Sequence, residues 1–96
     1  MIYFLKDYGI SENTINKLSL NPNTVFNIDV NKKDCIEIIT LLKSLEIKNI
    51  EDIMLYNLNL FFNTKEEVQE MFNKHNIKEL VVSINEDFTN IDKLYE

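Results

Sequence analysis

The scarcity of glycine and proline constrains this chain more than any other feature of its sequence. Glycine occurs only at position 9 and proline only at position 22. The tight turns of β-hairpins favour glycine, because they require positive φ angles. With 45% hydrophobic residues in a length of 96, the chain still has enough apolar side chains to form one core. We therefore expect an all-α fold in a single domain, residues 1–96, with short polar connections.

The spacing of apolar residues identifies the clearest helix. Between positions 31 and 45, apolar side chains recur at intervals of three and four residues, which places them on one face of an α-helix. These residues are Cys35, Ile38, Ile39, Leu42 and Leu45. The sequence therefore predicts an amphipathic helix over residues 31–45 with this face buried.

Capping signals delimit shorter helices in the first quarter of the chain. Gly9 suits the left-handed position after a first helix over residues 3–8, because glycine adopts a positive φ without strain. Ser11 can cap a second helix that runs to about Leu20 and is stopped by Pro22. We expect two short helices here.

The second half of the chain contains a strong helix start and an ambiguous segment. A helix is expected from position 48 or 49 to Asn57. Thr64 and Glu67 have the spacing of a capping box, in which each side chain accepts a hydrogen bond from the other residue's backbone N–H. Residues 79–84 could form a buried strand, but a single strand would have no partner. A short helix is the prediction for this segment.

A final helical turn is expected near the C-terminus, with Thr89 as its cap. The helices after position 64 direct a set of apolar side chains and one histidine toward the core by their spacing. These are Val68, Met71, Phe72, His75, Phe88, Ile91 and Leu94.

A helix end followed by a turn residue and an isoleucine occurs three times, at residues 5–10, 42–47 and 72–77. Residues 21–26 also match residues 57–62. Spacings of about 30 to 37 positions are typical of solenoid repeats. We predict a short stack of about two and a half to three helix-turn-helix repeats, with a compact helical bundle as the alternative.

This repeated pattern resembles the repeats of the mitochondrial transcription termination factor (mTERF) family. The resemblance implies stacked helix pairs with a third, short 3₁₀-like turn in each repeat, and a concave basic surface that binds nucleic acid. The chain departs from the family pattern in three respects. The turn glycine is present only at Gly9 and is replaced by Glu46 and Asn76, the proline is present only at Pro22, and the basic surface is missing. The implied fold is therefore better supported than the implied function.

Charge is distributed unevenly along the chain. Residues 1–50 contain six lysines and six acidic residues, whereas residues 51–96 contain four lysines and ten acidic residues, which accounts for the whole net charge of −6. The sequence has no arginine. Phosphate neutralisation and guanine recognition rely on basic side chains, arginine above all, so the composition disfavours nucleic-acid binding.

Two charged groups are candidate interaction surfaces. Four lysines of the first half, with Lys6 nearby in the repeat, could form a small basic ridge, and four glutamates of the second half could form an acidic surface. The lysines are Lys32, Lys33, Lys43 and Lys48, and the glutamates are Glu66, Glu67, Glu70 and Glu79. Ordinary solvated side chains are the competing interpretation of both groups.

No arrangement of residues supports catalysis or a cofactor. Cys35 lies on the apolar face of its helix, where a thiol behaves as a small hydrophobic group, and His75 lies on a packed helix face. The acid pairs 51/52, 66/67 and 86/87 fall at expected helix starts, where carboxylates interact favourably with the helix dipole. No phosphate-binding loop, nucleophile elbow or zinc-protease motif occurs in the sequence.

The sequence therefore indicates a noncatalytic interaction module, without cofactor or metal, whose partner is a protein. The alternatives are weak nucleic-acid binding through the lysine ridge, and an acidic inhibitor that mimics nucleic acid. We also expect a cytoplasmic, soluble protein without a membrane span, because no apolar run is long enough. Self-association through an exposed helix bearing Tyr3, Phe4 and Tyr8 is a further expectation.

Overall fold

The computed structural model describes residues 2–96, and these residues form six α-helices and three 3₁₀ helices without any strand. The all-α prediction is confirmed. In chain order the elements are η1 (Ile2–Tyr8), α1 (Glu12–Leu18), α2 (Pro22–Val30), α3 (Lys32–Ser44), α4 (Ile50–Tyr56), η2 (Leu58–Phe62), α5 (Lys65–Asn73), α6 (Ile77–Glu86) and η3 (Phe88–Tyr95).

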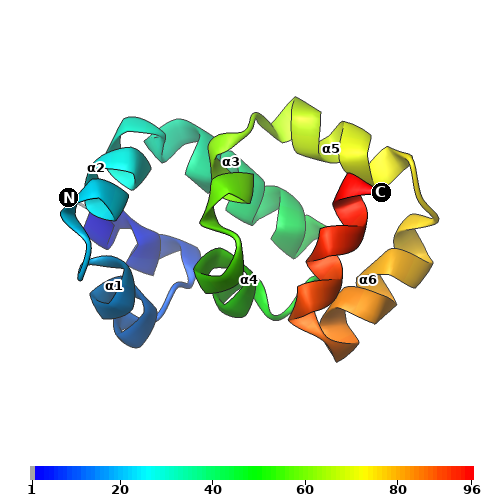
Figure 1. Cartoon of the computed structure of the whole chain (residues 1–96), viewed down its shortest axis with the longest axis horizontal. Helices are drawn as coiled ribbons and strands as arrows, with labels where there is room; N and C mark the ends of the chain where they lie inside the picture. Colours follow the sequence, from blue (N-terminus) through cyan, green and yellow to red (C-terminus); the bar gives the residue numbers. More distant parts are fainter. Residues whose placement is uncertain (1) are drawn as a thin grey trace.

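The nine elements form three successive units of three elements each. The first unit is η1–α1–α2, the second is α3–α4–η2 and the third is α5–α6–η3. Helix α3 packs against both η1 and α5, and α4 packs against both α1 and η3. The units follow one another along the longest dimension of the molecule, which is 36 Å (Figure 1). This arrangement is the short helical stack that the repeat pattern predicts.

The first two units contain the same turn after their first helix. The Ile10 N–H donates to the carbonyl of Leu5, and the Ile47 N–H donates to the carbonyl of Leu42, each at 3.1 Å. This hydrogen bond is typical of a Schellman motif, in which the residue after the helix adopts the left-handed conformation. The left-handed residue is Gly9 in the first unit, with φ +89°, and Glu46 in the second, with φ 65°.

The third helix end does not repeat this turn. Asn76 has a φ of −71° and acts as the N-cap of α6, where its side chain accepts a hydrogen bond from the Glu79 N–H. The expected equivalence of Asn76 with Gly9 is therefore wrong. Because an N-cap residue needs extended backbone, Asn76 begins the next helix and does not terminate the previous one.

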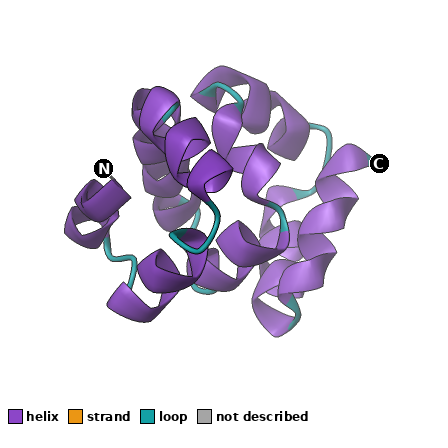
Figure 2. Ribbon diagram, turned by 60° about the vertical axis from the view of Figure 1, so that its left-hand side comes forward, coloured by secondary structure: helices purple, strands orange, loops and turns teal. Residues whose placement is uncertain are grey.

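One core runs through all three units, and each element contributes buried side chains to it. Short loops join the helices, so the stack needs few residues outside regular structure (Figure 2). The predicted stripe of α3 is buried, except that Leu45 is only partly covered. The largest fully buried side chains include Phe61, Phe72, Ile2, Leu5, Ile15, Ile28, Ile38, Ile39, Leu42, Ile53, Met54 and Leu60.

Several predicted helix boundaries and caps are confirmed, and one predicted cap is wrong. The capping box of α5 is present: the Thr64 N–H donates to Glu67 Oε1 at 2.7 Å, and the Glu67 N–H donates to Thr64 Oγ1 at 3.1 Å. Residues 79–84 are helical, within α6. The last helix is capped by Asp87, not by Thr89, since the Asp87 carboxylate accepts from the Thr89 N–H.

The interpretation of Pro22 as a helix stop is incomplete. Helix α1 already ends at Leu18, and Pro22 occupies the first turn of α2, where its missing N–H would have no partner in any case. Residues 22–30 therefore form a complete α-helix, whereas the matching segment in the second unit is the short 3₁₀ helix η2.

Side-chain hydrogen bonds seal the first junction, which is the contact between units one and two. The Glu51 Oε1 atom accepts from the Ser11 N–H at 2.8 Å, from the Ser11 hydroxyl at 2.6 Å and from the Thr14 hydroxyl at 2.7 Å. The Lys43 ammonium donates to the carbonyl of Tyr8. Both charged groups belong to unit two, and their hydrogen-bond partners belong to unit one.

The second junction, between units two and three, is sealed mainly by amides. The Asn85 side chain accepts from the Lys48 N–H at 2.9 Å and donates to the Glu46 carbonyl at 3.0 Å. The Asn49 amide donates to the Ile84 carbonyl at 2.8 Å. Within residues 2–96, the side-chain hydrogen bonds that cross one junction or the other join residues 35 to 40 positions apart in the sequence. That separation matches the spacing of the repeat.

Candidate functional site

An apolar groove lies between the end of α3 and the outer face of α6. Its volume is about 680 Å³. We call it the α6 groove and define it by its lining residues, which are Leu45, Glu46, Ile77, Lys78, Glu79, Val81, Val82, Ser83 and Glu86. An open hollow lined by apolar side chains and a few charged groups is a candidate contact site for another molecule.

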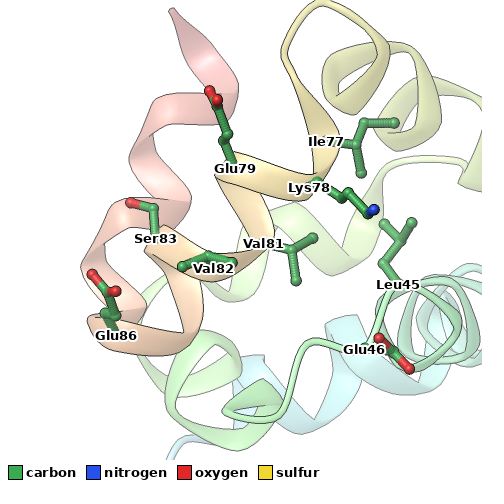
Figure 3. Close-up of a pocket in the computed structure, with 9 residues that line it drawn as sticks. All are labelled: Leu45, Glu46, Ile77, Lys78, Glu79, Val81, Val82, Ser83 and Glu86. Atoms are coloured by element: carbon green, nitrogen blue, oxygen red, sulfur yellow. The ribbon is translucent and has the colours of Figure 1, made fainter.

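The shape of the groove follows from how α3 ends and α6 begins. Leu45 lies at the end of α3 and faces Val81 and Lys78 of α6 across the hollow (Figure 3). Val82 lies on the solvent side of α6 and is 59% exposed. The opposite face of α6 buries Leu80 and Ile84 in the core. Helix α6 is therefore apolar on two faces, and only one of them is covered by the rest of the chain.

The rim of the groove is acidic. Its lining includes three glutamates and one lysine. Glu79 and Glu86 project from α6 on the side away from Leu45, while Glu46 stands beside the end of α3 (Figure 3). The C-terminus of α6 adds the partial negative charge of the helix dipole near Glu86. A ligand that suits this groove combines apolar side chains with positive charge.

Glu46 occupies its position on the rim at an energetic cost. It is the only residue other than glycine with a positive φ among residues 2–96. The left-handed conformation costs a residue with a Cβ atom roughly 1–2 kcal/mol relative to the right-handed one. The equivalent residue of the first unit is glycine, so the same turn exists in this molecule without that strain.

A second apolar surface lies at the other end of the stack, on α2. Phe26 and Val30 are one helical turn apart and are 67% and 65% exposed. Leu20, just before the helix, is 84% exposed. We call these three residues the α2 patch. Lys17 and Lys33 are also exposed, in the neighbouring helices α1 and α3.

The exposed apolar residues differ from those expected for self-association. Tyr3 is exposed, but Phe4 and Tyr8 pack partly against the core, because η1 lies against α2 and α3. Phe4 and Tyr8 are therefore less exposed than expected, and self-association through this helix stays a prediction. No helix is predicted directly after Pro22, so the sequence gives no indication of the α2 patch.

The four lysines of the predicted basic ridge do not form a compact cluster. Lys32 and Lys43 lie in the first and last turns of α3, roughly 16 Å apart along the helix axis. The Lys32 ammonium lies 5.1 Å from the ring centre of Phe4, and the Lys43 ammonium caps η1 through the Tyr8 carbonyl. The side chains of Lys33 and Lys48 are exposed.

The four glutamates of the predicted acidic surface are divided between two helices. Glu66 and Glu70 line a shallow hollow on α5 together with Lys65. Glu67 serves the capping box, and Glu79 belongs to the α6 groove. Glu79 therefore lines the same groove as Glu46 and Glu86, which the sequence does not indicate because Glu46 precedes the others by more than thirty positions.

Cys35 and His75 are in packed environments. Burial, reinforced by the neighbouring Asp34 carboxylate, raises the pKa of the Cys35 thiol to about 12. His75 lies just beyond α5, which ends at Asn73, and its buried Nε2 atom has no hydrogen-bond partner within residues 2–96. Among the same residues, no group of three or more His, Cys, Asp or Glu side chains could hold a metal ion. A thiol with so high a pKa is a poor nucleophile at neutral pH.

Burial alone would raise the pKa of the Glu51 carboxyl at the first junction, but the hydrogen bonds from Ser11 and Thr14 outweigh burial and lower it. Glu51 is therefore explained by a structural role. Across residues 2–96, the structure contains no helix with the length and hydrophobicity to cross a membrane.

Comparisons with protein-family models, with curated proteins and with solved structures found no match to this chain.

Proposed function

We propose that this chain is a noncatalytic protein-interaction module and that the α6 groove is its docking site. The observation that carries the proposal is an apolar hollow of about 680 Å³ with the exposed Val82 on its lining. Interfaces between proteins place apolar side chains at the centre and charged side chains at the rim. Apolar Leu45, Val81 and Val82, with glutamates around them, correspond to that arrangement.

Affinity capture with matched variants tests this proposal. We expect the wild-type chain to retain a protein partner from host lysate with or without nuclease, and Val82→Asp to lose it. Leu55→Asp is the control, because Leu55 is also an exposed apolar residue, 41% exposed, but lies on α4 outside the groove. Retention of the partner by Val82→Asp, or its loss after nuclease treatment, would contradict the proposal.

Weak nucleic-acid binding is the second candidate function. The division of each unit into three elements, with a 3₁₀ helix as the third element of units two and three, supports the resemblance to mTERF repeats. In this case the exposed Lys33 and Lys48 are the contacts for phosphates. Binding to RNA or DNA should then weaken steeply with salt and with Lys33→Glu. Absent or salt-insensitive binding at low salt would exclude this function.

The proposal also places the module in the cytoplasm, where its partner would be encountered. Fluorescence imaging of the tagged chain in its host checks this part, and a membrane or extracellular signal would contradict it.

A further inference from the structure

We propose that the α6 groove receives the α2 patch of a second copy of this chain, so that copies associate head to tail. The inference rests on the proposed function in so far as it uses the same groove. It goes further, because it names the occupant. Four features of the molecule support it: shape, apolar character, charge and position.

One surface is a hollow, the other is a projecting helix face, and both are apolar. The α6 groove is concave and lined by Leu45, Val81 and Val82. The α2 patch is a helix face from which Phe26 and Val30 project, both about two-thirds exposed. Helix α2 buries only Ile28 completely and Val25 in part, whereas Phe26 and Val30 face away from its own core. A helix ridge that enters a groove covers both surfaces in one contact.

The charges around the two surfaces have opposite sign. Residues 17–33, which include α2 and its flanks, contain three lysines and one aspartate. That aspartate, Asp29, already has an interaction within the molecule. The lining of the groove contains three glutamates and one lysine, Lys78. The half of the chain that carries the groove also holds the entire net charge of −6. Such a pattern favours contact between unlike ends over contact between like ends.

The two surfaces lie at opposite ends of the stack. Helix α2 is at one end of the 36 Å dimension and α6 is at the other (Figure 1). A single contact therefore leaves one free patch and one free groove on the pair. This is a heterologous interface, which adds further copies in the same direction. It continues between molecules the stacking that joins the units within one molecule.

A complementation experiment tests the head-to-tail arrangement. The variants Phe26→Asp and Val82→Asp each remove one surface and leave the other intact. Sedimentation velocity should show that wild-type mass rises with concentration beyond a dimer, while each variant alone remains a monomer. An equimolar mixture of the two variants should form a 1:1 dimer and nothing larger, because only one pair of intact surfaces is present.

Leu55→Asp is again the matched control and should associate like the wild type, since Leu55 is on α4. Wild-type association should weaken when NaCl is raised from about 0.05 M to about 0.5 M, because salt screens exposed charges. Both substituted side chains are exposed, so circular dichroism melts should match the wild type. Phe26→Ser and Val82→Ser replace any aspartate variant that melts earlier.

Two results would overturn the inference. One is a wild-type chain that stays monomeric at millimolar concentration, and the other is a mixture of variants that does not dimerise. If the wild type is monomeric yet loses its lysate partner through Val82→Asp, the groove still binds a protein and only the identity of the occupant is wrong. The two proposals therefore fail separately.

Discussion

The two junctions of the stack have similar backbone geometry but different chemistry. In each, a left-handed turn follows the first helix of a unit, with Gly9 at the first junction and Glu46 at the second. The first junction is sealed by the Glu51 carboxylate and the Lys43 ammonium. The corresponding loop of the second junction is sealed by the Asn49 and Asn85 amides.

This difference shows that the left-handed turn and the side-chain hydrogen bonds between units are separate requirements for stacking. A Schellman turn needs only a residue that tolerates a positive φ, whereas the seal needs polar groups that arrive from the next unit. The first junction therefore depends on pH through Glu51. At the second junction the amides do not titrate, and the Asp92 carboxylate accepts a hydrogen bond from the Tyr56 hydroxyl at 2.6 Å. The second junction instead has a strained Glu46 on the rim of the α6 groove.

The largest expected effect concerns the core beneath the two turns. Leu5 and Leu42 hold the same place in the repeated motif, and both are fully buried. Truncating a buried leucine to alanine costs about 2–5 kcal/mol. We expect Leu42→Ala to fall nearer the upper end, because α3 packs against both neighbouring units, whereas η1 has a neighbour on one side. Urea denaturation of Leu5→Ala and Leu42→Ala measures the two losses in the free energy of unfolding. Equal losses would contradict the greater weight that we assign to Leu42.

A smaller loss of stability is expected when Gly9, at the unstrained turn, is replaced by a residue with a side chain. Gly9 has φ +89°, and a Cβ atom placed there would lie 2.9 Å from the Lys43 ammonium nitrogen. Lys43 can move aside, so the backbone conformation dominates the cost, and Gly9→Ala should destabilise by about 1–2 kcal/mol. Gly9→Asn should cost less, because asparagine tolerates left-handed backbone. A melting temperature unchanged by Gly9→Ala would contradict the assigned turn.

The seal of the first junction should respond to pH. Its hydrogen bonds lower the pKa of Glu51 below the usual 4.5 in the folded chain, so Glu51 stabilises the fold above that pH. This contribution disappears as pH falls through the lowered folded value. We expect Glu51→Gln to cost about 1 kcal/mol at pH 7 and the difference from wild type to vanish in acid. Urea denaturation between pH 7 and pH 2 checks it, with Asn85→Ala as a variant whose cost should not change with pH.

The smallest expected effect is a gain in stability at the second turn. Glu46→Gly removes the strain of a left-handed glutamate and should stabilise the fold by about 0.5–1 kcal/mol. Glu46→Ala is the control, because it removes the carboxylate but retains the strained backbone. The glycine variant should also associate more weakly in sedimentation, since the rim loses a negative charge. A glycine variant that is no more stable than wild type would show that Glu46 is not strained.

Features set by neighbouring residues were predictable from the sequence. The α5 capping box depends on Thr64 and Glu67, three positions apart, and the buried stripe of α3 depends on the helical period. The sequence alone does not place Pro22 in α2, because proline is compatible with the end of one helix and with the first turn of the next. Leu18 ends α1 earlier than the pattern suggests.

The candidate site was largely unpredictable. Among the charged residues that line the groove, only Glu79 is a candidate surface residue from the sequence. Nothing in the sequence indicates that Glu46 and Glu86 line the same groove. Val82 belongs to an apolar run, and its exposure depends on which face of α6 meets the core. Likewise, the acid pair that includes Glu51 was explained by the helix dipole, whereas its partners Ser11 and Thr14 lie 37 to 40 positions away.

The sequence by itself determined an all-helical chain, its strongest helix and the spacing of its repeated units, because those properties arise from contacts within one or two helical turns. The tertiary structure alone decided which side chains seal the junctions, which apolar residues remain uncovered and where the acidic rim forms. Those outcomes depend on how units about 37 residues apart pack against one another. Local periodicity carries no information about that packing, and so it could not reveal the surfaces through which this chain is proposed to act.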